Sequence, residues 1–277
     1  MDIKGAYLNG ILKEHIYMCQ PKGYTDGTRQ VCLLIKMLYS LKQAGGEWNN
    51  ELDTKLRKKG YMHLKSDPCI YIWCIEDDIM IITVWVDNLL LFTMTIILMN
   101  KMKSDIKSKW EVTDLGEPMK IVRIEITMKP NTIAISSSRY IDHILQREGM
   151  DGLNSVSTPL DPNVPIVPNL DGNEGDRSNS YAKLLGELQY IANMMCPDIQ
   201  YVVNRLASYT ANPSLQHQTA LKRVLRYLSR TQSHGIIYKA LLDESDFYAY
   251  ADAAFMNADK CRLMIGYMFL AGEGAIM

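Results

Sequence analysis

A 21-residue stretch of hydrophobic positions, Ile79–Met99, contains one charged residue, Asp87, which Asn88 follows. About 20 apolar residues suffice to cross a bilayer, so a membrane span fits by length. An Asp at the centre of such a span costs about 2.5–3.5 kcal/mol, which counts against it. If the stretch forms two strands, Ile79–Val86 and Leu89–Thr93, the polar pair becomes a tight turn between runs rich in strand-forming residues. We therefore predict a β-hairpin with a carboxylate at its tip, and a membrane span or a buried helix as alternatives.

The rest of the hydrophobic pattern predicts a mixed α/β protein, in which helices and strands alternate before residue 150. Apolar positions recur at helical spacing in Trp48–Lys59, Ile97–Lys109, Tyr140–Glu148, Tyr181–Met195, Pro197–Tyr209 and Pro213–Arg230. Further apolar runs predict strands at Met119–Met128, Asn131–Ser136, Gly235–Tyr238, Phe247–Ala251 and Met264–Leu270. Residues 151–180 are rich in Pro, Gly, Asn, Asp and Ser, which indicates a linker.

The composition is that of an ordinary globular protein. The 277 residues are 47% hydrophobic and 22% charged, which suits one large or two modest domains. The net charge of −1 provides no overall basic field that would indicate a nucleic-acid or membrane partner. Basic residues cluster locally at 55–59, 101–109 and 222–230, but such clusters are usually solvated helix faces. Six scattered cysteines without a C-x-x-C pair indicate a reduced, intracellular protein rather than a zinc site.

Two segments have the character of motifs. Met1–Gly10 reads M-D-I-K-G-A-Y-L-N-G, and Leu38–Ala44 reads L-Y-S-L-K-Q-A. They resemble the reverse transcriptase of copia-type LTR retrotransposons, where the segments read M-D-V-K-T-A-F-L-N-G and L-Y-G-L-K-Q-A-P-R-Q-W. Further similar segments follow in the family's order, at Tyr17-Met18, Gln20-Pro21, Lys65–Cys69, Asp114–Glu117, Val156–Leu160, Pro197–Ile199, Leu225–Leu228 and Tyr250–Ala253. Because the set is collinear across essentially the whole chain, the resemblance is highly specific.

The resemblance implies a mixed α/β (α+β) fold with four parts. Residues 1–150 correspond to a palm with the primer-grip region, and the fingers that would precede it are missing. Residues 151–177 correspond to a linker, 178–234 to a helical thumb and connection, and 246–277 to the first part of a ribonuclease H sheet. From these limits we expect a truncated and degenerate product of a decayed element.

The chemistry that the resemblance implies is RNA-directed DNA polymerisation by two-metal nucleotidyl transfer. Two Mg²⁺ ions about 3.5–4 Å apart activate the 3′-hydroxyl and hold the triphosphate. Such hard cations prefer oxygen ligands, above all carboxylates. Asp2 and Asp87 correspond to the catalytic, metal-binding carboxylates, and Asn88 stands at the degenerate third position. The residues that correspond to nucleotide and template contacts are Lys42, Gln43 and Trp85.

The partners implied by the resemblance are an RNA template, a DNA primer or RNA–DNA hybrid, deoxynucleoside triphosphates and other Pol segments, without a membrane. A basic cluster in the thumb would hold duplex by its phosphates, and it consists of Lys222, Arg223, Arg226 and Arg230. Asp252 corresponds to a surviving carboxylate of the ribonuclease H module. Such a protein would be intracellular, in a cytoplasmic virus-like particle or in the nucleus.

Departures from the family pattern predict that this chain does not polymerise. Asn88 replaces the second carboxylate of the hairpin, and removal of one preorganised electrostatic group from a catalytic site costs about 10²–10³ in rate. Trp85 replaces a smaller aromatic residue, and Arg123 occupies a glycine position. The other replacements are Gly45 for Pro, Gly46 for Arg, Cys196 for Arg and Ala254 for an Asp.

Three alternatives stay open from the sequence. A non-enzymatic nucleic-acid binder would hold hybrid through the thumb helices. A small membrane protein would be built on residues 79–99. A chain whose core strands lack partners would not fold stably. Salt-sensitive binding of a hybrid would identify the nucleic-acid binder, and sedimentation with membranes would identify the membrane protein. Rapid proteolysis would identify a chain that does not fold stably.

Overall fold

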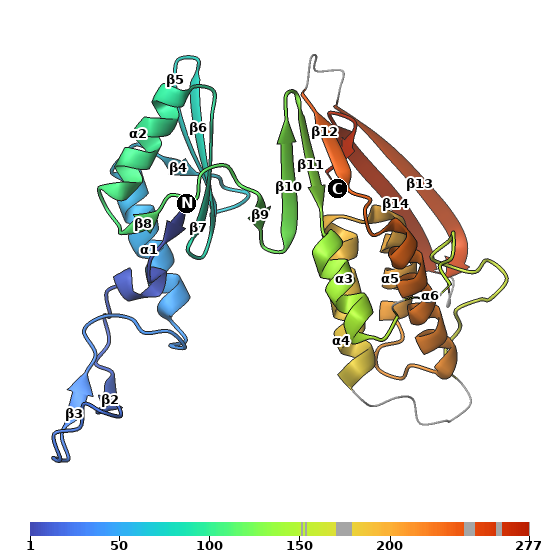
Figure 1. Ribbon diagram of the computed structural model, residues 1–277, viewed down its shortest axis with the longest axis horizontal. Coiled ribbons are helices and arrows are strands. Elements are labelled where there is room, and N and C mark those ends of the chain that lie inside the picture. Colours follow the sequence, from blue (N-terminus) through green and yellow to red (C-terminus); the bar gives the residue numbers. More distant parts are fainter. Residues whose placement is uncertain (151, 153, 170–178, 241–246, 259–261, 277) are drawn as a thin grey trace. The chain divides into compact units, whose positions relative to one another are not determined.

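In the computed structural model (Figure 1), the chain forms two compact units, Met1–Pro118 and Met119–Met277. Both units combine helices with antiparallel sheets, so the mixed α/β class predicted from the sequence is confirmed. The division by packing falls earlier than the predicted boundary at residue 150, and the functional assignment of the parts stays a prediction. The structure describes every residue except 151, 153, 170–178, 241–246, 259–261 and 277.

The first unit is built on a six-stranded antiparallel sheet with the strand order β4-β5-β6-β7-β1-β8. Its strands are β1 (Asp2–Ile3), β4 (Met62–His63), β5 (Ile70–Ile75), β6 (Asp78–Trp85), β7 (Asn88–Thr93) and β8 (Val112–Thr113). β-branched and aromatic residues are frequent in β5 and β6, and they favour a pleated, half-buried surface. The order of pairing places β1, at the start of the chain, between the much later strands β7 and β8.

Two helices cover one face of this sheet, α1 (Ala44–Arg57) and α2 (Ile96–Lys107) (Figure 1). Their buried positions recur every four residues, which is the spacing of one helix face. These positions are Ala44, Trp48, Leu52 and Leu56 in α1 and Leu98, Met102 and Ile106 in α2. With sheet residues such as Ile3, Ile82 and Leu89 they form one apolar core.

The hydrophobic stretch Ile79–Met99 forms most of the β6–β7 hairpin and the start of α2, which confirms the predicted hairpin. The alternatives of a membrane span and a buried helix are therefore wrong. The turn lies one residue earlier than predicted, because Trp85 pairs with Asn88 and leaves Val86 and Asp87 as the turn. Among the described residues, no helix has the length and apolar character needed to cross a bilayer.

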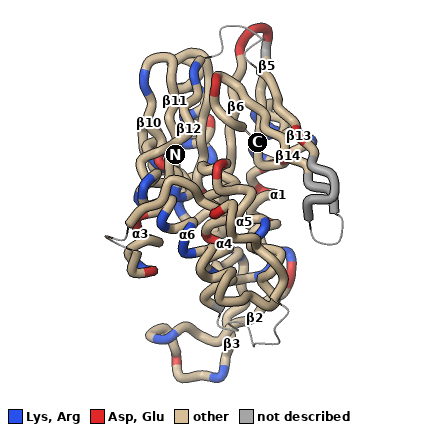
Figure 2. Tube along the Cα trace, turned by 90° about the vertical axis from the view of Figure 1, so that its right-hand side faces the viewer, with Lys and Arg blue, Asp and Glu red and all other residues tan. Residues whose placement is uncertain are grey.

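The first unit has two further features outside its core. The short helix η1 (Ala6–Asn9) leads to a hairpin of β2 (Tyr17–Cys19) and β3 (Val31–Leu33), which projects away from the sheet in Figure 1. At the end of β6 opposite to Asp87, Glu76 and Asp77 form an acidic turn that leads into Asp78, the first residue of β6, and this stretch is drawn in red beside the label of β5 in Figure 2.

The second unit combines a helical core with two small sheets. Its described helices are α3 (Ser138–Arg147), α4 (Asn179–Met194), η2 (Pro197–Ile199), α5 (Gln200–Ala207) and α6 (Leu215–Thr231). One sheet contains β9 (Lys120–Ile121), β10 (Ile124–Lys129), β11 (Thr132–Ser136) and β12 (Ile236–Lys239). The other contains β13 (Phe247–Ala258), β14 (Arg262–Ala271) and β15 (Gly274–Ala275). The predicted helices 140–148, 181–195, 197–209 and 213–230 all correspond to helices here, which confirms those predictions.

The Pro-rich segment predicted as a linker lies, in its described residues 154–169, along the helices of this unit. Ile166 is buried, and its carbonyl accepts hydrogen bonds from Arg205 Nη2 at 3.1 Å and the Tyr209 hydroxyl at 3.3 Å. Gln216 Nε2 donates to the carbonyl of Pro165 at 2.8 Å. These contacts make the segment part of the folded unit, although its composition is typical of a linker.

Candidate active site

Asp2 lies on β1, an interior strand next to the edge of the sheet of the first unit, where two later strands pair with it. On β1 it is directly opposite Asn88 of β7 and, on the other side, opposite Thr113 of β8. Residues that face each other across an antiparallel pair project from the same face of the sheet. Asp2 therefore shares one face with an amide and a hydroxyl side chain that come from residues 86 and 111 positions later.

The backbone hydrogen bonds set a close approach between Asp2 and Asn88. Ile3 N donates to the carbonyl of Asp87, and Leu89 N donates to the carbonyl of Met1, both at 2.8 Å. The Asp2–Asn88 pair lies between these bonds, so it is a non-hydrogen-bonded pair, the kind in which the two Cα atoms are about 4.5 Å apart. The structure thus brings the backbones of Asp2, Asp87 and Asn88 together at adjacent strand ends, and the role of their side chains as metal ligands stays a prediction.

The turn that carries Asp87 has an unusual backbone. Val86 has a φ of 57°, a left-handed conformation that is disfavoured for a β-branched residue. Its carbonyl accepts a hydrogen bond of 2.7 Å from the indole nitrogen of Trp48, a residue of α1 that is 3% exposed. The helix beneath the sheet therefore helps to hold the turn in place. Residues with a strained backbone are often found at active sites, and this turn carries a candidate catalytic residue.

Trp48 is a positioning residue that the sequence analysis did not assign. It stands where the family motif quoted above ends in W, and it was interpreted there as part of a helix. A buried tryptophan generally needs an acceptor for its N–H group. The sequence could therefore indicate that Trp48 has a partner, but the identity of that partner, Val86, depends on long-range packing.

Asn88 changes the electrostatics of the site. Its Nδ2 donates a hydrogen bond of 2.8 Å to Asp87 Oδ1. The amide is neutral, so it adds no negative charge, and it occupies one acceptor position on the neighbouring carboxylate. Asp2 and Asp87 are half-buried, and Asp2 has no side-chain hydrogen bond or ion pair in the described structure.

No nearby carboxylate takes over the role of the missing one. Asp114 follows Thr113 directly, but Lys103 Nζ lies 3.1 Å from its carboxylate and Lys107 Nζ lies 3.8 Å away. The hydrogen bond from Lys103 holds the pKa of Asp114 below its usual range. Within the described residues, no group of three or more His, Cys, Asp or Glu side chains could hold a metal ion. Asp2 and Asp87 thus offer carboxylate oxygens, the donors that a divalent ion prefers, but the described residues add no third acidic group for a second ion.

The predicted nucleotide and template contacts lie at the edges of the first unit. Lys42 is exposed just before α1, and Trp85 is 58% exposed at the end of β6. Gln43 is the residue before α1, and its Nε2 donates a 2.6 Å hydrogen bond to Glu14 Oε2. The side chains of Lys42 and Trp85 are thus available to a ligand, whereas Gln43 already has a partner. Their role in nucleotide binding stays a prediction.

The predicted phosphate contacts belong to α6 in the second unit and are only partly available. Arg223 contacts Asp161 at 3.4 Å and Thr158 Oγ1 at 3.0 Å, and Arg226 Nε donates to the carbonyl of Asn154 at 2.6 Å. These two side chains hold the 154–161 segment. The two members of the cluster that are exposed are Lys222 and Arg230.

The remaining departures from the family pattern occupy distinct environments. Gly45 and Gly46 are exposed in the first turn of α1. Cys196 is buried in the helical core, where desolvation raises the pKa of its thiol to about 12. Asp252, the predicted ribonuclease H remnant, is exposed on β13 opposite Gly266. The side chain of Ala254 lies outside the described part of the chain.

Comparison with known proteins establishes the family. The sequence profile described as "Reverse transcriptase (RNA-dependent DNA polymerase)" matches residues 1–162, which include Asp2 and the whole β6–β7 hairpin. The chain belongs to this reverse transcriptase family. Reverse transcriptases act on nucleic acids and generally use divalent metal ions, so the carboxylates on β1 and in the β6–β7 turn lie in the appropriate domain.

Curated relatives identify the reverse transcriptase as that of copia-type retrotransposon Pol polyproteins. The retrovirus-related Pol polyprotein from transposon RE1 of Arabidopsis thaliana is 34% identical over 279 residues, which cover 100% of this chain and 19% of the relative. The corresponding protein from transposon TNT 1-94 of Nicotiana tabacum is 30% identical over 286 residues, covering 100% and 22%. A putative transposon Ty5-1 protein of Saccharomyces cerevisiae is 28% identical over 243 residues, covering 87% and 79%. The chain therefore spans about a fifth of the length of the two Pol polyproteins.

Proposed function

We propose that Asp2 and Asp87 are the metal-binding carboxylates of this reverse transcriptase domain, in RNA-directed DNA synthesis by two-metal nucleotidyl transfer. We further propose that Asn88 leaves the site too weakly charged for this chain to polymerise. The observation that carries the proposal is the pairing of Asp2 with Asn88, directly beside Asp87. The insertion of β1 next to β7 supports this proposal, because it brings the backbone of residue 2 beside that of residues 87 and 88, which lie far away in sequence.

The side chains present determine what the site can do. Divalent ions at such a site supply activation of the attacking 3′-hydroxyl and neutralisation of charge on the transferred phosphate. Asp2 offers both carboxylate oxygens, whereas Asp87 has one oxygen bound by the Asn88 amide. Trp48 holds the turn through the Val86 carbonyl and so limits the positions that Asp87 can occupy.

The missing charge has a sizeable effect. Near a protein surface, with an effective dielectric constant of about 20, two unit charges about 4 Å apart interact by about 4 kcal/mol. Because a dication carries two unit charges, replacing an aspartate by asparagine removes more attraction than this value for a single pair of unit charges. Solvent exposure and salt reduce the loss. A loss of only about 1.4 kcal/mol already lowers affinity tenfold. Weak metal binding is therefore the expected defect of this site.

Metal binding by the whole chain tests this proposal without requiring catalysis. We expect Asn88→Asp to tighten Mn²⁺ binding at least tenfold, as measured by electron paramagnetic resonance of free Mn²⁺, and Asp87→Asn to weaken it. Asp77→Asn is the matched control, because Asp77 lies in the acidic turn at the other end of β6. If Asn88→Asp and Asp77→Asn change the affinity equally little, Asp2 and Asp87 do not form the proposed site.

Primer extension tests the expected lack of activity. On an RNA template with Mg²⁺ and all four deoxynucleoside triphosphates, we expect no incorporation by the unaltered chain. Incorporation that disappears in Asp87→Ala would show that Asn88 is compatible with catalysis and would overturn this part of the proposal. Incorporation that persists in Asp87→Ala would point to a contaminating polymerase, which a repeat on chain purified further would remove.

A second candidate is a non-enzymatic nucleic-acid-binding function. It is supported by Lys222 and Arg230, which are exposed on α6 and thus accessible to phosphates. This function predicts binding of an RNA–DNA hybrid that is insensitive to Asp87→Ala and falls with salt. Loss of hybrid binding in Asp87→Ala would favour the catalytic site as the place of contact instead.

A further inference from the structure

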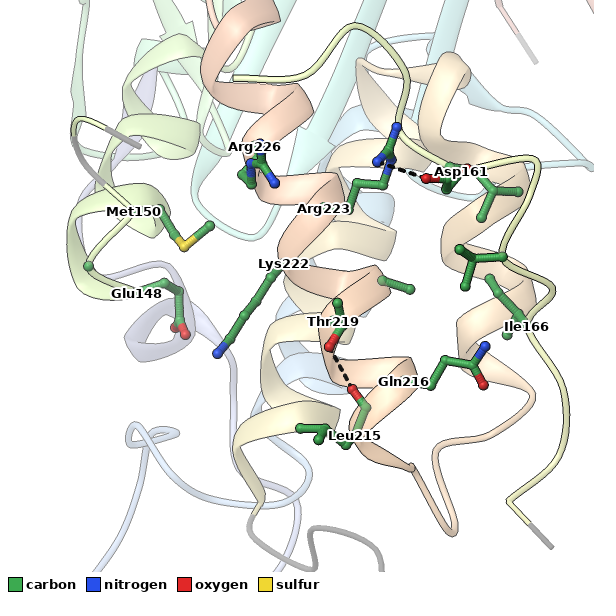
Figure 3. A pocket seen from close by; sticks show the side chains of 14 residues that line it. Glu148, Met150, Asp161, Ile166, Leu215, Gln216, Thr219, Lys222, Arg223 and Arg226 are labelled. Atoms are coloured by element: carbon green, nitrogen blue, oxygen red, sulfur yellow. Dashed lines mark hydrogen bonds and ion pairs between the residues drawn. The ribbon is translucent and has the colours of Figure 1, made fainter. Parts of the chain in front are cut away.

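A pocket of about 780 Å³ opens in the second unit between α6 and the segment that contains residues 160–166 (Figure 3). Its volume falls in the range of about 300–1,000 Å³ that small-molecule sites occupy. Apolar side chains supply much of its lining, notably those of Met150, Leu160, Val164 and Ile166. The polymerase chemistry proposed above makes no use of this pocket.

The helix α6 gives the same pocket a basic wall. Lys222, Arg223 and Arg226 all line it, and in Figure 3 they extend from one helix in different directions. Arg223 reaches toward Asp161, while Lys222 extends toward the side where Glu148 and Met150 lie. The pocket therefore combines an apolar surface with cationic groups at its edge.

The acidic residues of the lining do not neutralise these cations completely. Asp161 pairs with Arg223 at 3.4 Å, and Glu148 pairs with Arg147, outside the pocket lining, at 2.9 Å. Lys222 Nζ has no carboxylate within 4 Å in the part of the chain that the structure describes. Arg226 uses Nε for the carbonyl of Asn154, and its terminal nitrogens have no partner among the described residues. Two positive groups thus remain for a ligand.

We propose that this pocket binds a small amphipathic anion, with its apolar body against Met150, Val164 and Ile166 and its carboxylate or phosphate head at Lys222 and Arg226. Covering the apolar surface lowers the free energy of the complex, and the cations favour an acidic head group on the ligand. A nucleic-acid backbone would satisfy the cations but leave the apolar surface uncovered. The proposal is independent of the polymerase site, since all its residues belong to the second unit.

Displacement of a fluorescent probe from the full chain tests the proposal. The probe is 8-anilinonaphthalene-1-sulfonate, and the competitors are decanoate, decanol, inorganic phosphate and a short RNA–DNA hybrid. We expect decanoate to compete at least tenfold more strongly than decanol, because it alone of the two has an anionic head. We expect phosphate to displace no probe, because it has no apolar body.

Variants locate the site. Lys222→Met should weaken decanoate about tenfold and leave decanol unchanged, while Val164→Asp should weaken both. Arg230→Met is the matched control, because Arg230 is exposed on the same helix but does not line the pocket. Equal competition by decanoate and decanol, or equal effects of Lys222→Met and Arg230→Met, would overturn the proposal. Displacement by the hybrid but not by decanoate would assign this face to nucleic acid instead.

Discussion

Trp48 and Trp110 are two buried indoles in one environment, and only one of them uses its N–H group. Their rings meet edge to face with centroids 5.8 Å apart in the core of the first unit. Trp48 Nε1 donates to the carbonyl of Val86 at 2.7 Å, whereas Trp110 Nε1 has no hydrogen-bond partner among the residues that the structure describes. The pair therefore allows the contribution of the Trp48 hydrogen bond to be separated from that of ring burial.

We predict that Trp48→Phe lowers the free energy of unfolding by about 1 kcal/mol more than Trp110→Phe does. Both changes remove similar ring volume, but only the first leaves a carbonyl without its donor. Urea unfolding followed by circular dichroism measures the difference. Equal losses would show that Trp48 does not hold the turn at Val86.

The β9–β10 turn carries strain that a single substitution can relieve. Ile121 pairs with Ile124, so Val122 and Arg123 form the turn, with φ values of 44° and 67°. Two left-handed residues are typical of a type I′ turn, which favours Asn followed by Gly. This backbone explains why the family has glycine where Arg123 stands here, a preference that the sequence pattern by itself does not explain.

We predict that Val122→Asn raises the free energy of unfolding by about 1 kcal/mol, since a β-branched residue pays the largest cost at positive φ. The hydrogen bond from the Tyr190 hydroxyl is retained, because it is made to the backbone carbonyl of residue 122. Thr127→Asn, on an exposed position within β10, is the control and should not stabilise the protein. A lower stability of Val122→Asn would contradict the proposed strain.

At the scale of elements, the start of α6 depends on a neutral histidine. His217 is fully buried, and its Nδ1 accepts a hydrogen bond of 2.9 Å from the backbone N–H of Ser214. Its Nε2 therefore carries the proton and donates to the carbonyl of Val167 at 2.9 Å. Protonation of Nδ1 would remove the bond to Ser214. Burial, with a smaller contribution from Arg205, lowers the pKa of His217 from its usual value of 6.5.

The sign of the resulting pH dependence follows from the lowered pKa. Below about pH 6.5 the unfolded chain binds a proton at this histidine before the folded chain does. The stabilisation is therefore complete above that pH and is lost as the pH falls toward the pKa of the folded state. We predict lower urea midpoints at pH 5.5 than at pH 7.5 and a smaller difference in His217→Gln. His143→Gln, an exposed histidine of α3, should keep the full difference.

Local sequence was a good guide to these elements where local interactions determine them. The β-branched run before Asp87 indicated β6, and the entry signal at Asn212-Pro213 indicated α6, whose cap is Ser214. The position of the β6–β7 turn was wrong by one residue, because Asn88 is drawn into β7 by pairing with Asp2, a partner distant in sequence. The packing of residues 154–169 was missed for the same reason, since it depends on side chains from α5 and α6.

At the scale of the whole molecule, charge is balanced in each unit. Residues 1–118 contain 15 Lys and Arg against 15 Asp and Glu, and residues 119–277 contain 15 against 16. Neither unit therefore generates a strong basic field of the kind that steers nucleic acid over long distances. Any contact with a duplex must come from local groups such as Lys222 and Arg230.

We accordingly predict a shallow salt dependence for hybrid binding. Two phosphate contacts give a slope of about −1.8 in a plot of log affinity against log salt, or a loss of about tenfold between 50 and 200 mM. Fluorescence anisotropy with a labelled RNA–DNA hybrid measures the slope, and Arg230→Met should reduce it by about one half. A loss of a thousandfold or more would require many further contacts and would contradict this estimate.

Because β1 has only two residues, its register alone decides which face of the sheet the Asp2 side chain projects from. A slip of this two-residue strand by one position would exchange Asp2 with Ile3 and push a carboxylate into the apolar layer. Such a slip would be unfavourable because the hydrophobic core accommodates the Ile3 side chain but not a carboxylate. Selection for ordinary packing at Ile3 and Leu89 thus also maintains the register of the polar residues.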